Sequence, residues 1–505
     1  MGPVTRLLIR RARLVPIGPT AAPPEHPVDV LVEDGVVTTV AGDLDPRPGV
    51  EEVDADGRWC APGLWDQHVH LTQWTLASQR LDLAPARSPE QALILVAERV
   101  AALPGVPIIG WGHRPGGWQR DVTVSELDGV TGDTPVVLIA GDGHHAWLNT
   151  TALMHLAMPV RDSVVRETEW FSVYPRLATL AGTDGTSPEA FRRALQAAAA
   201  RGVVGLVDFE FGAGRQEWAE RWAEGCDLLR IRWATYADTL DEVLEAGLRT
   251  GDALPGCDER ITMGPLKIIS DGSLNTRTAW CCEPYADAHR LDHPAGQPNL
   301  SGTELRDLLG RAHRGGLEIA THAIGDAAVA EALAAYAETG AIGSIEHVQM
   351  VGRDDVRRMA ELGVRASVQP AHLLDDRDVS ELIWPDRTDR CFPLRWMLDD
   401  GVPLAFGSDA PVSPLDPWLA IAAAVHRSDD ERPPWHPEQA LTAREALAAS
   451  VDGRGSVHAG MPADLVLLDA DPLAEHPDTA SAGLALRTMP VALTLVGGAT
   501  AYSAV

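Results

Sequence analysis

The chain has few cysteines and no long apolar run. No stretch approaches the ~18 apolar residues of a membrane span, and arginines interrupt the first apolar segments, so an unbroken signal-peptide region is not expected. The six cysteines, of which Cys281 and Cys282 are adjacent, form no disulfide framework and no Cys-x-x-Cys metal motif. We therefore expect a cytoplasmic protein whose thiols are buried or incidental.

Positive charge is also scarce. The chain has 42 lysines and arginines against 72 acidic residues, which gives a formal charge of −30. Nucleic acid and anionic membrane surfaces carry charge of the same sign, so neither is expected as a partner. The remaining expectation is a small-molecule substrate, with a homodimer as the common default for the assembly.

What the sequence does contain is an alternation of apolar strands and helical stretches, which is typical of parallel β/α units. Helical patterns at 187–202, 303–316 and 326–340 each end in glycine, as helices often do. Eight such strands predict an α/β fold, a (β/α)8 barrel. The predicted strands are 63–70, 202–210, 229–237, 265–272, 317–323, 343–350, 365–370 and 403–410.

Both chain ends are rich in short strands, with an Asp-Gly turn near the start and a Gly-Gly turn near the end. This pattern predicts a small β-sandwich domain built from residues 1–61 plus 455–505, and a barrel over 62–454. The interval after the first barrel strand is too long for one crossover. We interpret residues 71–186 as an insertion on the active-site face.

Chemistry in such a barrel lies at the carboxyl ends of its strands. His68 and His70 are two residues apart on the first strand, and side chains at i and i+2 point to the same face. A lone His-x-His is a weak signal, but further polar residues follow at the ends of later strands. These are Lys267, His322, His347 and Asp409. Four imidazoles and a carboxylate favour zinc, with Mn, Fe, Co and Ni as alternatives.

Eight motifs span nearly the whole chain: APGLWDQHVH, DGHHAWLN, LKIISDGSLNTRTA, THAIGDAAV, IEHVQM, SVQPAH, FGSDAPV and ADLVLLDADP. In this order they resemble the amidohydrolase superfamily, and within it the branch of YtcJ-like and N-substituted formamide deformylase-like proteins. The resemblance implies a metal-dependent hydrolase barrel with a β-sandwich made from both termini, in agreement with the strand count.

The resemblance also implies a ligand set. His68 and His70 would bind the more buried metal with Asp409, and His322 and His347 would bind a second metal. Lys267 falls where the family commonly has a lysine carboxylated by CO2, which bridges the two ions. Burial would lower the pKa of this amine and free it for carbamate formation. The alternatives are a lysine paired with a carboxylate such as Asp271, or a site with one metal and an unmodified lysine.

These parts predict hydrolysis of a C–N bond in a non-peptide amide, for example an N-substituted formamide. A metal-activated hydroxide would attack the carbonyl, with Asp409 as general base; a purely structural ligand role for Asp409 is the alternative. The same site could act on an ester or lactone, a cyclic imide, a deamination or an isomerisation. A barrel without catalysis, serving as a scaffold, is a remote alternative because every expected ligand is present.

Five further residues are candidates for handling the substrate. His144 would help to hold the substrate carbonyl oxygen, or its segment would only fix a loop. Arg277 would hold an anionic group or, as we favour, anchor the loop 271–300. His372 lies just past the seventh strand and could reach the mouth. Tryptophan is abundant, 15 in all, so Trp111 and Trp147 would line an apolar or aromatic pocket unless they are core residues.

Overall fold

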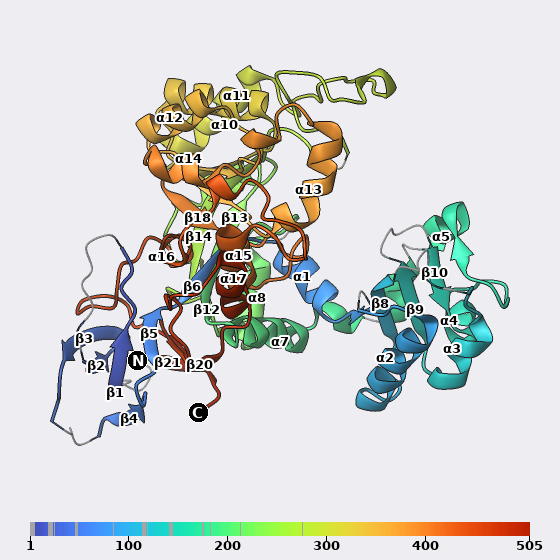
Figure 1. Cartoon of the computed structure of the whole chain (residues 1–505), viewed down its shortest axis with the longest axis horizontal. Coiled ribbons are helices and arrows are strands. Elements are labelled where there is room, and N and C mark those ends of the chain that lie inside the picture. The colour runs from blue at the N-terminus through green and yellow to red at the C-terminus, as the bar shows by residue number, and fades with distance from the viewer. Residues whose placement is uncertain are drawn as a thin grey trace. The chain divides into compact units, whose positions relative to one another are not determined.

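The structure is a computed structural model that describes residues 6–18, 24, 26–45, 49–83, 85–113, 118, 120–140, 145–173, 176–181, 183–212, 214–274 and 276–505. The chain forms two compact units (Figure 1). One unit comprises residues 1–71 and 195–505, and the other comprises residues 72–194. The larger unit contains the barrel and the sheet made from the chain ends.

The barrel is an eight-stranded parallel sheet, which confirms the predicted fold class. Its strands follow chain order around the sheet, each paired in parallel with its sequence neighbour. Several strands are buried along their whole length, as expected where both faces of a parallel sheet are covered. The strands are β6 (Leu64–Val69), β12 (Val203–Asp208), β13 (Arg230–Thr235), β14 (Ile261–Ile269), β15 (Ile319–Ala323), β16 (Gly343–His347), β17 (Arg365–Val368) and β18 (Leu404–Phe406).

The first and last barrel strands meet at their carboxyl ends, and the residues that join them belong to the candidate site. The backbone N–H of Asp409 donates to the carbonyl of His68 at 2.7 Å, and that of His70 donates to the carbonyl of Ala410 at 2.9 Å. Gly407 permits this approach, because a Cβ atom there would lie 2.7 Å from the backbone nitrogen of His68. The barrel therefore closes where its polar residues lie.

Helices follow most barrel strands, and their ends carry recognisable stop and start residues. Ser301 and Glu304 form a capping box at the start of α10, and Gly340 ends α11 with a left-handed φ of 68°. Both helices lie within two residues of the predicted ranges. The helices of this unit after β12 are α8 (Arg215–Ala223), α9 (Leu240–Glu245), α10 (Gly302–Arg314), α11 (Asp326–Thr339), α12 (Arg353–Leu362), α13 (His372–Ile383), α14 (Leu394–Asp399), α15 (Pro417–His426), α16 (Ala443–Ala448) and α17 (Thr479–Arg487).

The chain ends form a second sheet, in which N-terminal and C-terminal strands lie side by side (Figure 1). Its order is β21-β20-β19-β5-β1-β2-β3, with β4 also paired to β1. Turns at Asp34-Gly35 and Gly497-Gly498 have positive φ at both positions, which suits tight hairpins. Apolar side chains from both chain ends pack into one buried cluster on this sheet. The strands are β1 (Arg6–Leu14), β2 (Val28–Glu33), β3 (Val36–Ala41), β4 (Glu51–Asp54), β5 (Trp59–Pro62), β19 (Leu465–Leu468), β20 (Val491–Val496) and β21 (Ala499–Ser503).

The insertion forms a unit with its own sheet and cores, and it extends to residue 194, somewhat beyond the predicted 186. The sheet order is β11-β10-β9-β8-β7, and apolar clusters pack against it. Its elements include β7 (Leu81–Asp82), α2 (Pro89–Ala102), β8 (Ile108–His113), α3 (Val124–Thr131), β9 (Val136–Ala140), β10 (His145–Leu148), α4 (Thr150–His155), β11 (Val165–Arg166), α5 (Glu167–Val173) and α6 (Leu177–Ala181). Helix α1 (Leu71–Ser78) leads into this unit, and α7 (Pro188–Ala199) leads out of it.

The structure shows the state of the cysteines and the character of the helices. All six cysteines are free thiols, and four of them are buried. Among the described residues, no helix combines the length and the apolar character that crossing a membrane requires.

Candidate metal centre

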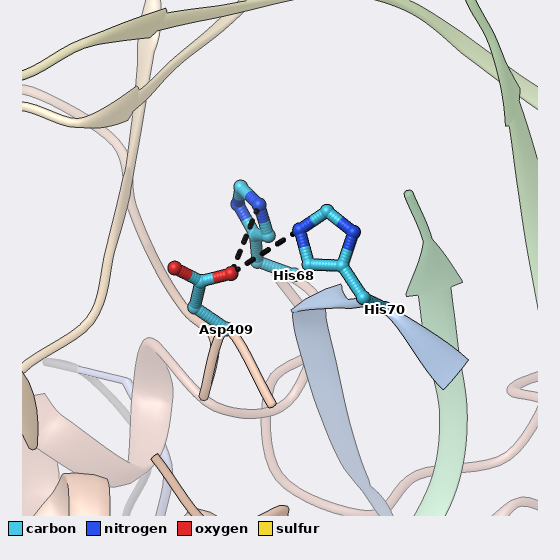
Figure 2. A group of neighbouring side chains, drawn as sticks. All are labelled: His68, His70 and Asp409. Carbon is cyan, nitrogen blue, oxygen red and sulfur yellow. Dashed lines mark ion pairs between the residues drawn. The ribbon is translucent and has the colours of Figure 1, made fainter. Parts of the chain in front are cut away.

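Two histidines and an aspartate meet at the carboxyl end of the barrel (Figure 2). Oδ1 of Asp409 lies 3.6 Å from Nε2 of His68 and 3.4 Å from Nε2 of His70. All three residues are buried, with at most 9% of their surface exposed. Two imidazole nitrogens and one carboxylate oxygen that converge in this way form a donor set that suits a divalent metal ion.

Asp66 fixes the backbone that carries this group. Its Oδ1 accepts hydrogen bonds from the backbone N–H of His68 at 3.1 Å and of Ser408 at 2.8 Å. One carboxylate thus ties β6 to the segment after β18, directly beside both histidines and Asp409. Burial raises the pKa of Asp66 to about 6. These contacts give Asp66 a supporting polar role beside the proposed ligands.

A second group of potential ligands shares Asp409. It consists of His347 at the end of β16 and His372 at the start of α13, both buried. Nε2 of His372 lies 3.9 Å from Oδ2 of Asp409, and no hydrogen-bond partner for this nitrogen is found in the described part of the chain. A buried polar atom without a partner is unusual in a folded protein, and it is consistent with a bound ligand.

The backbone is strained around this second group. His347, Val348 and Asp409 have φ angles of 74°, 44° and 56°, in the left-handed region that L residues rarely adopt. Such residues cost about 1–3 kcal/mol each and cluster at functional sites. Here two of the three are candidate ligands.

His322 lies beside His347, but its imidazole is held elsewhere. The two ring centroids are 4.4 Å apart. Nε2 of His322 lies 3.2 Å from the carbonyl oxygen of Gly272 and 3.4 Å from Oδ1 of Asp271. These acceptors hold the proton on Nε2, so Nδ1 is the nitrogen whose lone pair can bind a metal. The structure therefore groups His372, rather than His322, with His347 and Asp409.

Lys267 extends from β14 into the same region and is 2% exposed. Its Nζ lies 3.2 Å from Nε2 of His68 and 4.3 Å from the ring centroid of Phe209. The alternative pairing with Asp271 is not what the structure shows. The carboxylate of Asp271 accepts the backbone N–H groups of Ile324, Gly325 and Trp280 instead.

Burial shifts the pKa values of several ionisable groups in this region. Burial, with the charge of Lys267, holds the pKa of His68 well below its usual value and lowers that of His322 to about 4. Burial also lowers the pKa of Lys267 to about 8. Burial alone would raise the pKa of Asp409, but His70, His372 and Lys267 hold it below its usual value. The lowered pKa values of His68 and His322 leave these imidazoles neutral beside an ionised Asp409, and metal binding requires these protonation states.

Comparison of the sequence with known proteins shows the family of this chain. A model described as "Amidohydrolase family" matches residues 51–502, nearly the whole chain. The chain belongs to the amidohydrolase family. It is 25% identical to the putative amidohydrolase YtcJ of Bacillus subtilis over 94% of this chain and 95% of that protein. It is also 25% identical to the N-substituted formamide deformylase of Arthrobacter pascens over 94% of each.

A solved structure agrees with this assignment. The crystal structure of an uncharacterized metal-dependent hydrolase from Pyrococcus furiosus superposes with a TM-score of 0.73 at 25% identity, and the match covers 93% of this chain and 100% of that one. Family membership and this likeness make the chain a metal-dependent amidohydrolase. The buried nitrogen and oxygen donors described above fit such a metal.

The residues of this amidohydrolase that were predicted to contact substrate have different surroundings. His144 lies outside the described residues. Trp147 has no exposed surface and packs in the core of the insertion. Its indole N–H donates to the carbonyl of Thr123. These contacts agree with the alternative that Trp147 is a core residue. Trp111 in β8 is 36% exposed beneath the guanidinium of Arg80.

Arg277 and His372 are the other two residues that were predicted to contact substrate. Nε of Arg277 lies 3.3 Å from Oδ2 of Asp287, so its guanidinium spans the loop 271–300 as the favoured anchoring role requires. His372 reaches the candidate centre through its contact with Asp409.

Three residues of the site, Glu346, Phe209 and Phe211, were not predicted from the sequence. Glu346 is 1% exposed and lies behind His68, and Phe209 packs on the imidazole of His68 at a centroid distance of 4.5 Å. Phe211 stacks on His70 at 4.9 Å and is half exposed. The stretch DFEF at 208–211 begins at the last residue of strand β12, so its position at a strand end was the signal that could have indicated these aromatic residues.

Proposed function

We propose that this amidohydrolase cleaves the C–N bond of a non-peptide carboxamide, with N-substituted formamides as the first class to test. The observation that carries the proposal is the convergence of His68, His70 and Asp409 at the barrel end. The substrate class is suggested by the relative named N-substituted formamide deformylase, which aligns with 94% of this chain.

The proposed metal ligands are Nε2 of His68, Nε2 of His70 and a carboxylate oxygen of Asp409. A second ion would be held by His347 with either His372 or Nδ1 of His322. Nitrogen and carboxylate donors of this kind favour zinc. When bound, a divalent cation supplies Lewis acidity, which activates water and polarises a substrate carbonyl.

Asp409 has the position and charge for proton transfer. It is ionised at neutral pH, and Oδ2 faces His372 while Oδ1 faces His68 and His70. We assign it to accept a proton from the attacking water and to deliver that proton to the departing amine, which requires the same carboxylate in both steps. His144 and Trp111 remain proposed substrate contacts.

Lys267 is proposed to be carboxylated. It is the only lysine in the chain, and all permanently charged basic side chains are arginines. A guanidinium stays protonated in proteins, whereas an amine with a pKa of about 8 is partly free at neutral pH and can react with CO2. The single lysine is buried beside His68, and its amine could supply the nitrogen of the proposed carbamate.

This uniqueness makes the carboxylation directly measurable. Protein labelled with 15N at the lysine side chain gives one Nζ signal, and 13C-labelled bicarbonate would couple to it if a carbamate forms. We expect that coupling in the metal-loaded protein and its absence in Lys267→Met. A signal of a free ammonium group at saturating metal and bicarbonate would contradict carboxylation.

A substrate panel tests the proposed reaction. It contains N-substituted formamides, other carboxamides, a cyclic imide, esters and lactones, each assayed with zinc-loaded enzyme and with Asp409→Asn. We expect the largest kcat/KM among the amides and its loss in the variant. If ester or lactone turnover greatly exceeded amide turnover and was also abolished by Asp409→Asn, the amidase assignment would be wrong.

A further inference from the structure

Glu346 is a buried carboxylate behind one of the proposed metal ligands. It lies on β16 directly before His347, and 1% of its surface is exposed. Its Oε2 lies 2.8 Å from Nδ1 of His68, and its Oε1 accepts a hydrogen bond from the hydroxyl of Ser344 at 2.6 Å. Both oxygens are thus engaged, so the carboxylate has a fixed orientation.

Glu346 and His347 both face the barrel interior although they are neighbours in one strand. Successive side chains of a regular strand point to opposite faces. The positive φ of His347, followed by that of Val348, ends the extended conformation at this point. As a result the ring of His347 lies 5.0 Å from the ring of His68, which Glu346 contacts through Nδ1. The strained backbone thus places two consecutive side chains around one imidazole.

The contact with Glu346 fixes the tautomer of His68. A carboxylate only accepts hydrogen bonds, and a neutral imidazole has one N–H, so the proton lies on Nδ1. The lone pair is then on Nε2, the nitrogen that faces Oδ1 of Asp409 at 3.6 Å and Nζ of Lys267 at 3.2 Å. The opposite tautomer would present an N–H to the metal and could not bind it.

We propose that Glu346 is a positioning residue, which holds His68 in the Nδ1-protonated tautomer with Nε2 directed at the divalent metal. The assignment rests on the proposed metal site. Removing the hydrogen-bond partner of a ligating histidine typically weakens metal binding or activity by about 10- to 100-fold. Glutamine keeps the shape and one acceptor oxygen but loses the charge, so its effect should be intermediate.

The first experiment measures the zinc affinity of the full chain by chelator competition in four proteins. Relative to wild type, Glu346→Leu should bind Zn²⁺ about 10- to 100-fold more weakly, with Glu346→Gln between the two. Asp208→Asn is the matched control, because Asp208 is also fully buried at a barrel strand end but bonds to backbone N–H groups and Trp218 rather than to an imidazole. The control should bind Zn²⁺ like wild type. Equal affinity in Glu346→Leu and wild type would overturn the assignment.

A second experiment needs no metal. Metal-free protein with ring-15N histidine, in which a His68→Gln variant identifies the His68 signals, reports which nitrogen carries the proton. All proteins carry Lys267→Met, because the ammonium of Lys267 lies 3.2 Å from Nε2 and would itself favour a proton on Nδ1. We expect the proton on Nδ1 with Glu346 or Glu346→Gln, and its loss from Nδ1 in Glu346→Leu. A proton on Nε2 with Glu346 present, or on Nδ1 in Glu346→Leu, would refute the positioning role. If wild type bound no Zn²⁺, the proposed function would fail, and the tautomer would still decide the role of Glu346.

Discussion

The carboxyl end of the barrel and the terminal sheet bury very different side chains. The terminal sheet is filled by an apolar cluster from both chain ends, with Leu465 and Leu467 facing partners from the N-terminal strands. The barrel end buries imidazoles, an amine and carboxylates, and it includes a histidine nitrogen without a hydrogen-bond partner in the described residues. Its backbone is strained at His347, Val348 and Asp409.

This difference indicates a division of roles. Apolar burial stabilises the fold by about 25 cal/mol per Å², whereas buried polar groups and left-handed residues cost free energy and persist where function requires them. Substitutions at the barrel end should therefore change metal binding and activity. Substitutions in the terminal sheet should change stability and leave the metal site intact.

The largest effect is expected for Asp409→Asn. The amide cannot accept the proton that the carboxylate takes, so kcat should fall by about 10²- to 10⁴-fold while the protein remains folded. Steady-state rates on the best substrate of the panel, with circular dichroism as a check of folding, measure this. Asp354→Asn is the control, since that carboxylate is 97% exposed on α12. Activity near wild type in Asp409→Asn would remove the proposed base.

Asp464→Asn should destabilise the larger unit strongly. Asp464 has no exposed side-chain surface and lies 2.8 Å from Arg230 and 2.9 Å from Arg454. Breaking a buried ion pair leaves unpaired charge and costs about 3–5 kcal/mol in the free energy of unfolding. Asp469→Asn provides the control, because its pair with Arg58 is partly exposed and should contribute about 0–1 kcal/mol. Equal denaturation midpoints of the two variants would contradict this expectation.

The same carboxylate predicts a pH dependence. Burial alone would raise the pKa of Asp464, but the bonds from Arg230 and Arg454 hold it below its usual value. Its contribution to stability is therefore complete above the unfolded pKa of about 3.9 and is lost as the pH falls through the lower folded pKa. Urea unfolding as a function of pH should show a smaller acid-dependent loss in Asp464→Asn than in wild type. Identical slopes would mean that another group controls the acid transition.

Leu467→Ala tests the terminal sheet by itself. Leu467 is 1% exposed within the apolar cluster of that sheet. Truncation leaves a cavity, so the free energy of unfolding should fall by about 2–5 kcal/mol. The zinc content of the folded protein should equal that of wild type. A variant that lost its zinc while it remained folded would show that sheet and site are coupled, against the division of roles proposed above.

The smallest effect is expected for Ser301→Ala at the start of α10. The hydroxyl of Ser301 accepts the backbone N–H of Glu304, and its loss should cost about 0.5–2 kcal/mol. Because this helix end is exposed, metal affinity and kcat should not change. Thermal denaturation together with zinc titration measures both quantities, and a change in zinc affinity would be the contradictory result.

Regular patterns explain why much of the fold could be predicted from the sequence. Apolar strands alternate with helices that end in glycine, as at Gly340, so each of the eight predicted strands overlaps a barrel strand. Strand β14 begins at Ile261, four residues before the predicted position 265. The spacing of His68 and His70 predicted that both would face one side, and in the structure both contact Asp409.

The remaining features depend on tertiary structure. Strand alternation would point Glu346 away from His347, and only the positive φ of His347 brings both side chains inside. The orientation of His322 depends on the loop that carries Asp271 and Gly272. The burial of Trp147 depends on how the insertion packs around its own sheet.

The most direct test of the central claim is the metal content of the purified protein. Elemental analysis should find one or two equivalents of a divalent ion per chain in wild type. A His68→Ala/His70→Ala variant that keeps its fold should lose at least one equivalent together with its activity. Absence of a stoichiometric divalent ion from an active wild-type protein, or full metal content in the double variant, would contradict the account.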